Sequence, residues 1–276
     1  MSNIQIREQA RLQTDVESEG ASVAKIIVFN QKGGVGKTTT TLNLAALLVS
    51  RGRAPLVIDL DPQAHLSSIS CANVGEGNES LYGFYQDSRQ LSDLIRPGAG
   101  GWPIIPSHLD LSKVDTQFGK GPQALNRLNA GIVRENLNTA RPILMDACPM
   151  LGVLSLNGIF ASDRILVPIS ADYLAIKGAL QVERTLRALE RVIKQPPMRR
   201  YVITRFDGRR KMSWDVDNKL REHFGSALCE TRIAENVSLA ESPALNCDVF
   251  AHAPDSRGAK DYSALLDELE AVGFLN

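Results

Sequence analysis

The feature that most constrains this chain is a glycine-rich loop between an apolar strand and a helix. Residues 25–30 (KIIVFN) are rich in β-branched side chains and predict a buried strand. Residues 38–50 have helical apolar spacing, and Gly52 follows their end. The intervening sequence, Lys32-Gly-Gly-Val-Gly-Lys-Thr-Thr39, has glycines that let successive backbone N–H groups turn inward. A loop of this kind, opening onto the positive end of a helix, predicts a polyphosphate site.

The residue types in this loop favour a nucleoside triphosphate with Mg²⁺. Lys37 is placed to reach the β- and γ-phosphates, and the Thr38 hydroxyl is placed to ligate the metal. The usual pattern has a glycine five residues before Gly36, where this chain has Gln31, and the lysine at position 32 is additional. We predict an ATP site made by the whole loop: Lys32, Gly33, Gly34, Val35, Gly36, Lys37, Thr38 and Thr39.

Aspartates stand where two further apolar strands end. Residues 56–60 and 143–146 are buried-strand patterns that carry Asp59 and Asp146, and Asp61 follows Asp59 by two residues. In α/β proteins the ligand binds at the carboxyl ends of the strands, which is where these aspartates stand. A cation that bridges phosphates needs carboxylates, directly or through water, so Thr38, Asp59 and Asp146 are the predicted metal site. Taken alone, each aspartate is equally compatible with a strand-end turn or a helix cap.

Strand-like and helix-like segments alternate along the rest of the chain. Further strands are predicted at residues 165–169 and 201–204, and helices at 175–193, 214–224 and 259–272. Continuous apolar strands that alternate with helices predict an α/β P-loop NTPase fold, with a mostly parallel twisted sheet and helices on both faces.

We predict two parts in the chain: a flexible N-terminal leader at residues 1–22, and a single P-loop ATPase domain at residues 23–276. The leader is polar, which favours a loose tail, although a segment that docks a partner is the alternative. Residues 71–121 are rich in glycine and proline near Trp102, and we interpret them as an insertion with short elements.

Composition excludes several classes of protein. The 31 basic residues equal the 31 acidic ones, so any surface for nucleic acid must be local. No run of about 18 apolar residues is present, which argues against a membrane span. Four widely spaced cysteines form no CxxC pair and no disulfide framework, and a reducing cytoplasm is the simplest compartment; they are Cys71, Cys148, Cys229 and Cys247.

These motifs together resemble the ParA/MinD group of deviant Walker A ATPases. The phosphate loop and Asp59-Leu-Asp-Pro-Gln63 are similar to the group as a whole. Four later segments narrow the resemblance to the ParA (Soj-like) branch, and it extends from about residue 24 to residue 269; they are Asp146-Ala-Cys-Pro149, Thr204-Arg-Phe-Asp-Gly-Arg209, Glu241-Ser-Pro243 and Ser256-Arg-Gly-Ala259 with Tyr262.

The resemblance implies a mechanism and site roles. Such proteins form ATP-dependent homodimers, in which the residue matching Lys32 reaches the partner's phosphates, much as an arginine finger does. Asp61 would position the attacking water, and Asp59 and Asp146 would hold Mg²⁺. Lys32, Lys37 and Asp61 are therefore the expected catalytic residues of a slow ATPase. Residues expected on the adenine side are Arg205, Asp207, Glu235 and Asn236.

The resemblance also implies partners and a location. The ATP-bound dimer would bind DNA without sequence preference, and a ParB-like or cargo-adaptor protein would stimulate hydrolysis. The expected result is partition or positioning of a plasmid, a chromosome origin or a protein assembly, in the cytoplasm and on the nucleoid. The sequence does not distinguish among these cargoes.

A basic segment is the candidate DNA-binding surface. Residues 191–221 contain ten basic residues and only three acidic ones, Asp207, Asp215 and Asp217. We predict contacts to phosphates from Arg209, Arg210, Lys211 and Arg221. A solvated face without a special role is the alternative. In the Soj-like pattern arginines flank an Asn-Val pair, where this chain has Glu235 and Ser238.

Other functions fit the sequence less well. An ATP-dependent regulator that binds only proteins is the main alternative. A nitrogenase iron-protein role would need cysteines that bridge a cluster, and Cys148 is not so arranged. A MinD-like role would need a basic amphipathic C-terminal helix, whereas residues 261–276 are acidic and predict a packing helix. A metabolic synthetase would need a second-substrate site, which the sequence does not reveal.

Overall fold

Eight strands form one continuous sheet in the computed structural model, which describes residues 23–119, 122–193 and 195–275. The predicted leader at residues 1–22 lies outside these ranges. The order across the sheet is β3-β4-β2-β5-β1-β6-β7-β8, and every pairing is parallel except that of β3 with β4. The bounds are β1 Lys25–Val28, β2 Leu56–Asp59, β3 Arg96–Pro97, β4 Pro103–Ile105, β5 Ile143–Asp146, β6 Arg164–Ser170, β7 Met198–Phe206 and β8 Leu228–Ala234.

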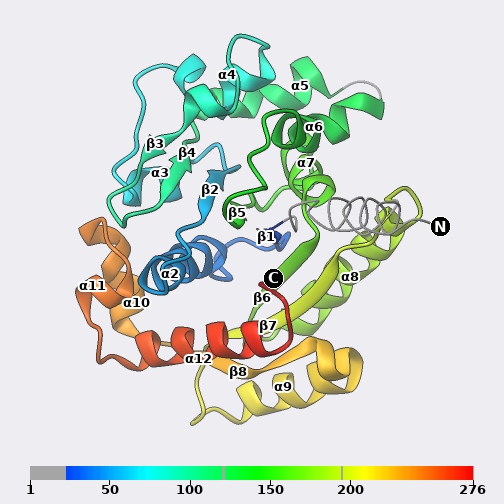
Figure 1. Ribbon diagram of the computed structural model, residues 1–276. Coiled ribbons are helices and arrows are strands. Elements are labelled where there is room, and N and C mark those ends of the chain that lie inside the picture. The colour runs from blue at the N-terminus through cyan, green and yellow to red at the C-terminus, as the bar shows by residue number, and fades with distance from the viewer. Residues whose placement is uncertain (1–22, 120–121, 194, 276) are drawn as a thin grey trace, which may run out of the picture.

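Helices cover both faces of this sheet, as predicted (Figure 1). The α-helices are α2 Lys37–Ser50, α3 His65–Ile69, α4 Leu81–Tyr85, α5 Val114–Phe118, α6 Arg127–Arg134, α7 Val153–Ala161, α8 Ala175–Glu190, α9 Lys211–Phe224, α10 Val237–Glu241, α11 Val249–His252 and α12 Arg257–Ala271. Short 3-10 helices are η1 Gly77–Glu79, η2 Ser92–Leu94, η3 Leu109–Lys113, η4 Pro122–Asn126, η5 Gly225–Ala227 and η6 Ser242–Leu245.

The side chains of β1 show how one strand supplies both core layers. Ile27 packs with α7 and α8 in the core on one face, and Ile26 and Val28 pack with α2 and α12 on the other. All three side chains are fully buried. Apolar residues on both sides of a strand explain why the sequence reads as a continuous apolar run and not as an alternating one.

Three strands, β3, β4 and β8, were not predicted, because their sequence signals are weak; β3 has only two residues. β4 has only three residues, and it extends the sheet beyond β2, so the segment at 71–121 contributes to the main sheet as well as short helices. In β8 the side chains of Leu228, Cys229 and Ile233 are buried, whereas the polar residues between them, Glu230, Thr231 and Arg232, are exposed or partly exposed. β8 is an edge strand that contacts both α12 and α9, and its charged residues interrupt the apolar run that would have marked it as a strand.

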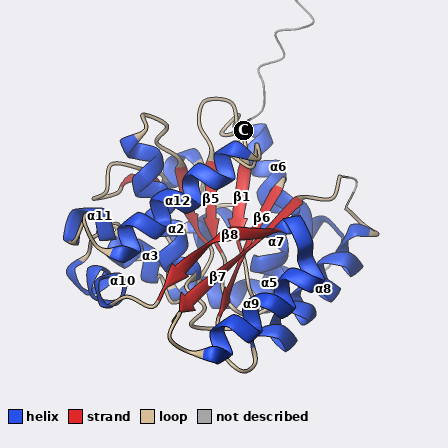
Figure 2. Cartoon of the chain, turned by 90° about the horizontal axis from the view of Figure 1, so that it is seen from below, coloured by secondary structure: helices blue, strands red, loops and turns tan. Residues whose placement is uncertain are grey.

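The C-terminal helix packs against the sheet as predicted. α12 lies beside β8 and α2, and it buries Tyr262, Leu265 and Leu269 (Figures 1 and 2). Within the described ranges, no helix has both the length and the apolar character needed to cross a bilayer.

Candidate functional site

The phosphate loop connects β1 to α2 in a backbone conformation that depends on glycine. Gly34 and Gly36 have φ angles of 73° and 88°, and Gly36 is the N-cap of α2. A side chain is strongly disfavoured at such angles. The Thr204 hydroxyl, at the end of β7, donates to the Val35 carbonyl oxygen at 2.8 Å. The loop is thus fixed from the neighbouring part of the sheet, with its N–H groups at the positive end of a 14-residue helix.

A cavity of about 850 Å³ opens at this loop. One end is lined by the loop itself, including Lys37 and Thr38, and by Asp61. Another part of the wall comes from β7, β8, the loop after β8, α10 and α12; these residues are Thr204, Arg205, Ile233, Ala234, Glu235, Asn236, Leu239, Ala240 and Tyr262. A cavity that joins a helix N-terminus to a wall of mixed apolar and polar side chains suits the phosphates and the base of one nucleotide.

Lys37 is the buried cation of the site. Its side chain is only 7% exposed, and its Nζ donates to the Lys32 carbonyl oxygen at 3.1 Å. Burial lowers the pKa of Lys37, while the carboxylates of Asp146 and Asp61 act in the opposite direction. An ammonium group placed in this way gains most when a phosphate neutralises it.

Thr38 and Asp146 form the direct contact of the predicted metal site. The Thr38 hydroxyl donates to Asp146 Oδ2 at 2.7 Å, and the Thr41 hydroxyl donates to Oδ1 at 3.3 Å. Within the described residues no three His, Cys, Asp or Glu side chains gather into a metal cluster. The hydroxyl and carboxylate oxygens are suitable donors for Mg²⁺, which would need phosphate and water oxygens to complete its shell.

Asp59 is directed toward the protein. It is fully buried beside Asp146, its register partner on β5. Its carboxylate accepts hydrogen bonds from the Ser67 N–H and hydroxyl, at 2.9 and 2.6 Å, and from the Asp61 N–H at 3.0 Å. Burial raises the pKa of Asp59. The pKa of Asp146 is raised too, mainly by burial and to a smaller extent by repulsion from Asp59. This pair of carboxyls therefore lacks a counter-charge that Mg²⁺ would supply.

Asp61 lies in a tightly held turn at the cavity wall. Its Oδ1 accepts from the Gln63 N–H at 2.9 Å, and its carbonyl oxygen accepts from the Ser107 hydroxyl at 2.6 Å. The turn therefore depends on Ser67 and Ser107, two residues that the sequence analysis did not identify. A side chain fixed at the phosphate end of the cavity is suited to positioning a water molecule.

Lys32 points away from the cavity of its own chain. Its Nζ forms an ion pair with Asp172 Oδ2 at 2.5 Å, in the loop that follows β6. Neither residue is among those that line the cavity. The structure therefore separates the two lysines of the loop: Lys37 faces the phosphate end, and Lys32 lies at the outer edge.

Three of the four predicted adenine-side residues line the cavity. Arg205 lies in the left-handed region, with φ of 52°, and approaches the Gly34 carbonyl oxygen at 3.5 Å. Glu235 and Asn236 also line the cavity. Asp207 does not, since it pairs with Arg209 and Arg210 instead. Tyr262, which hydrogen-bonds to Thr40 at 3.1 Å, lines the cavity too, although the sequence analysis used it only as a family marker.

The basic segment is much less positive than its sequence suggests. Carboxylates from outside residues 191–221 pair with its arginines: Glu183 and Glu190 with Arg199, Glu268 with Arg200, Glu235 with Arg205 and Arg210, and Glu230 with Arg221. The excess of seven positive charges that the sequence predicts is therefore largely neutralised by partners distant in the chain.

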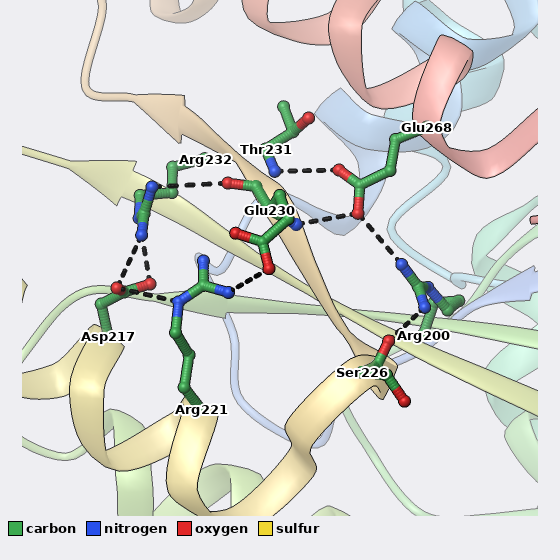
Figure 3. A network of polar contacts seen from close by, with 8 residues as sticks. All are labelled: Arg200, Asp217, Arg221, Ser226, Glu230, Thr231, Arg232 and Glu268. Atoms are coloured by element: carbon green, nitrogen blue, oxygen red, sulfur yellow. Dashed lines mark hydrogen bonds and ion pairs between the residues drawn. The ribbon is translucent and has the colours of Figure 1, made fainter. Parts of the chain in front are cut away.

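Arg221 illustrates this difference. It pairs with Asp217 at 3.2 Å and with Glu230 at 2.6 Å. Both contacts belong to a group of polar residues that we call the β8 network (Figure 3); its members are Arg200, Asp217, Arg221, Ser226, Glu230, Thr231, Arg232 and Glu268. Arg221 is also ten residues along α9 from Lys211, about 15 Å at the helical rise. The structure therefore does not bring Arg221 together with Arg209–Lys211, which lie exposed at the start of the helix.

Comparison with known proteins agrees with this geometry. Residues 23–197 match the protein family described as an AAA domain. The chain is 35% identical to the chromosome-partitioning ATPase Soj of Thermus thermophilus, over 91% of this chain and 97% of that protein. It is 30% identical to the sporulation initiation inhibitor protein Soj of Bacillus subtilis, over 90% of this chain and 98% of that protein.

A solved structure carries the same fold with nucleotide. Cobyrinic acid a,c-diamide synthase from Mycobacterium smegmatis, with a bound ATP analogue and magnesium, is 25% identical. It has a TM-score of 0.76 and covers 90% of this chain and 95% of that chain. Fold and site thus define a P-loop ATPase with an additional lysine in its phosphate loop. Within that class, the chain belongs to the ParA/Soj family, as the sequence resemblance predicted.

Proposed function

We propose that this protein is an ATP-hydrolysing dimeric switch that partitions or positions cargo through ATP-dependent, non-specific binding to DNA. The observation that carries the proposal is that the two lysines of the phosphate loop occupy different positions. Lys37 is buried at the phosphate end of the cavity, and Lys32 lies outside that cavity with its side chain partly exposed. Kinship with chromosome-partitioning Soj supports the cellular role.

Each residue of the site has a defined part in hydrolysis. Lys37 and the loop N–H groups hold the phosphates, while Thr38 and Asp146 hold Mg²⁺, which supplies charge neutralisation when bound. Asp61 positions the attacking water from its fixed turn. Lys32 completes charge stabilisation only on the partner's nucleotide, so the reaction is slow in a monomer. A ParB-like or cargo-adaptor protein would accelerate hydrolysis in the dimer.

The proposed DNA surface is the start of α9. Arg209, Arg210 and Lys211 are exposed there, and Lys211 has no ion-pair partner among the described residues. The guanidinium groups of Arg209 and Arg210 stay largely exposed although both pair with Asp207, so DNA phosphates can reach them. A dimer would present two such surfaces and bind DNA more tightly than a monomer. The expected location is the nucleoid in the cytoplasm.

The test uses Asp61→Ala protein, in which slow hydrolysis should maintain the ATP-bound dimer. Binding to random-sequence duplex DNA is measured by fluorescence anisotropy with Mg-ATP and without nucleotide. With roughly four phosphates neutralised, affinity should fall about a hundredfold between about 50 and 200 mM salt. Lys177→Ala, which removes an exposed lysine on α8, is the matched control and should bind like its parent.

A second function is favoured by one observation. Glu235 lies 3.7 Å from Arg205 and 3.8 Å from Arg210, and it adds negative charge beside the proposed DNA surface. If DNA binding is absent at low salt while dimerisation is confirmed, a regulator that binds only proteins becomes the better explanation. The relative in Bacillus subtilis named as a sporulation initiation inhibitor makes that class worth testing.

A further inference from the structure

Asp172 holds the side chain of Lys32 in the single chain. The Lys32 ammonium lies 2.5 Å from Asp172 Oδ2, and the two side chains are 34% and 43% exposed. Asp172 is itself fixed, because Oδ2 also accepts from the Ser170 hydroxyl at 2.5 Å and Oδ1 accepts from the Leu174 N–H at 3.0 Å. Hydrogen bonds from Lys32 and Ser170 hold the pKa of Asp172 below its usual value, although partial burial alone would raise it.

The backbone of Lys32 is fixed to the same part of the sheet. Its N–H donates to Asn30 Oδ1 at 2.9 Å, and the buried Asn30 amide donates to the Pro168 carbonyl oxygen of β6 at 2.8 Å. Because β1 and β6 are neighbouring parallel strands, the loops after them meet at one edge. Lys32 and Asp172 therefore face each other without any movement of the sheet.

Nucleotide binding would remove one of the hydrogen bonds that hold the Lys32 backbone in place. Lys37 Nζ donates to the Lys32 carbonyl oxygen at 3.1 Å. A phosphate that draws Lys37 into the cavity removes that bond, so the Lys32 backbone loses a partner when ATP binds. The ion pair with Asp172 is separate from the cavity and is not affected directly. It must be broken by a stronger counter-charge, such as the triphosphate of a second chain.

We propose that Asp172 is a positioning residue that retains Lys32 in its own chain and thereby sets the threshold for ATP-dependent dimerisation. This inference rests on the proposed dimeric switch. In the single chain the carboxylate neutralises Lys32 and keeps it at the outer edge. In the dimer each Lys32 exchanges one carboxylate for phosphate oxygens of the partner's nucleotide. The highly exposed Tyr173 and Leu174 beside Asp172 leave this edge open to a second copy.

The size of the effect follows from the exposure of the pair. Breaking one partly exposed ion pair corresponds to about a two- to fivefold change in an equilibrium constant. A symmetric dimer breaks two such pairs, so the two factors multiply. Asp172→Asn should therefore tighten the ATP-bound dimer by about four- to twenty-five-fold. Ser170→Ala, which removes one hydrogen bond from Asp172, should act in the same direction and more weakly.

Two measurements test the inference on the full chain. The first is the rate at which an amine-acylating reagent modifies Lys32 in nucleotide-free protein, quantified by fragment-ion mass spectrometry. The second is the dimer dissociation constant with a non-hydrolysable ATP analogue and Mg²⁺, obtained by sedimentation equilibrium. Asp215→Asn makes the same charge change at an exposed site on α9, so it is the matched control.

The inference predicts that Asp172→Asn raises both the acylation rate of Lys32 and the dimer affinity, while Asp215→Asn changes neither. Asp172→Glu should restore much of the wild-type behaviour. In a Lys32→Ala background, Asp172→Asn should no longer tighten the dimer, because the residue through which it acts is gone. That last result separates positioning of Lys32 from a general effect on the fold.

Two results would overturn the inference. Equal acylation of Lys32 in wild type and Asp172→Asn would show that the carboxylate does not retain the lysine. Faster acylation with an unchanged or weaker dimer would show that the ion pair does not set the threshold. A different result, no dimer in any variant at high protein concentration, would contradict the proposed dimeric switch itself and would remove the threshold with it.

Discussion

The phosphate end of the cavity and the β8 network use the same kinds of charged residue in opposite ways. At the cavity, burial raises the pKa of Asp59 and Asp146, and their hydrogen bonds do not compensate. In the β8 network, burial also acts on Asp217 and Glu268, yet hydrogen bonds outweigh it and leave their pKa values below the ordinary range. The donors are arginines to Asp217 and chiefly the Thr231 and Glu230 N–H groups to Glu268.

The difference distinguishes a binding site from a structural ion-pair network. Glu268 joins α12 to the edge strand β8 and to Arg200, and each of its oxygens has a donor (Figure 3). Asp146 receives only hydroxyl groups, and its nearest cation, Lys37, is itself directed elsewhere. Buried carboxyls at a cavity that lack enough donors or cations are typical of a binding site, where a ligand supplies the missing charge. Carboxylates whose oxygens are all hydrogen-bonded, as in the β8 network, hold helices to a sheet.

The largest expected effect comes from removing the cation at the cavity. Lys37→Ala should weaken Mg-ATP binding by about 3–5 kcal/mol, more than a hundredfold, because a buried ammonium–phosphate pair is lost. Isothermal titration calorimetry measures this, with Lys177→Ala as the matched exposed-lysine control. Retained tight ATP binding by Lys37→Ala would show that the cavity is not the nucleotide site.

The β8 network should affect stability and leave nucleotide binding unchanged. Glu268→Gln should lower the free energy of unfolding at pH 7 by about 2 kcal/mol, since a hydrogen-bonded charge is lost. The lowered pKa of Glu268 means that its contribution is present near neutral pH and disappears as pH falls through its folded-state pKa. Urea unfolding from pH 3 to 7, compared with the exposed-residue variant Glu222→Gln, measures this difference. A changed ATP affinity in Glu268→Gln would contradict the assignment of the β8 network to structure alone.

The paired carboxyls at the cavity should show the opposite pH dependence. The pKa of Asp146 is raised in the fold, so its favourable contribution is present at low pH and is lost as pH rises. Nucleotide-free Asp146→Asn should therefore be more stable than wild type by about 1–2 kcal/mol at about pH 8, and similar at about pH 4. Thermal unfolding at a series of pH values checks the sign. A gain in stability that is independent of pH would indicate a cause other than ionisation.

The smallest effect separates two basic residues of α9. Lys211→Ala should lower the slope of log affinity against log salt for DNA by about one, because it removes one phosphate contact. Arg221→Ala should leave that slope unchanged and reduce stability, since Arg221 pairs with Asp217 and Glu230. Anisotropy titrations on the Asp61→Ala background, combined with unfolding curves, give both quantities. Equal slopes for the two variants would contradict the assignment of Arg221 to structure.

The sequence predicted the parts of the site that are continuous in the chain. The strand, phosphate loop and helix form one segment, and Asp59 and Asp146 stand at strand ends, where topology alone brings them together. The partners that fix these residues lie elsewhere in the chain. Ser67 of α3, Asp172 and Thr204 of β7 each make a hydrogen bond or ion pair at the loop or the adjoining strand ends, and the sequence analysis assigned none of them such a role.

The charge of the basic segment in the fold differs from the count along the sequence for the same reason. Counting along residues 191–221 gives only the local acids, whereas Glu183, Glu235 and Glu268 approach through tertiary packing. For Arg221, the sequence does not show that β8 brings Glu230 within 2.6 Å of its guanidinium group. A count of charges in sequence thus estimates a surface only where the partners are local, as Asp207 is for Arg209.

Hydrogen–deuterium exchange with and without Mg-ATP tests the contrast between the two regions most directly. The structure predicts that nucleotide slows exchange in residues 31–41, in residues 59–67 between β2 and α3, and in residues 233–240 from the end of β8 into α10. It predicts no change in α9 from residue 215 to residue 224 or in the first half of β8. Slowed exchange in the β8 network, without protection of the phosphate loop, would contradict the assignment of the cavity as the ligand site and of the network as structural.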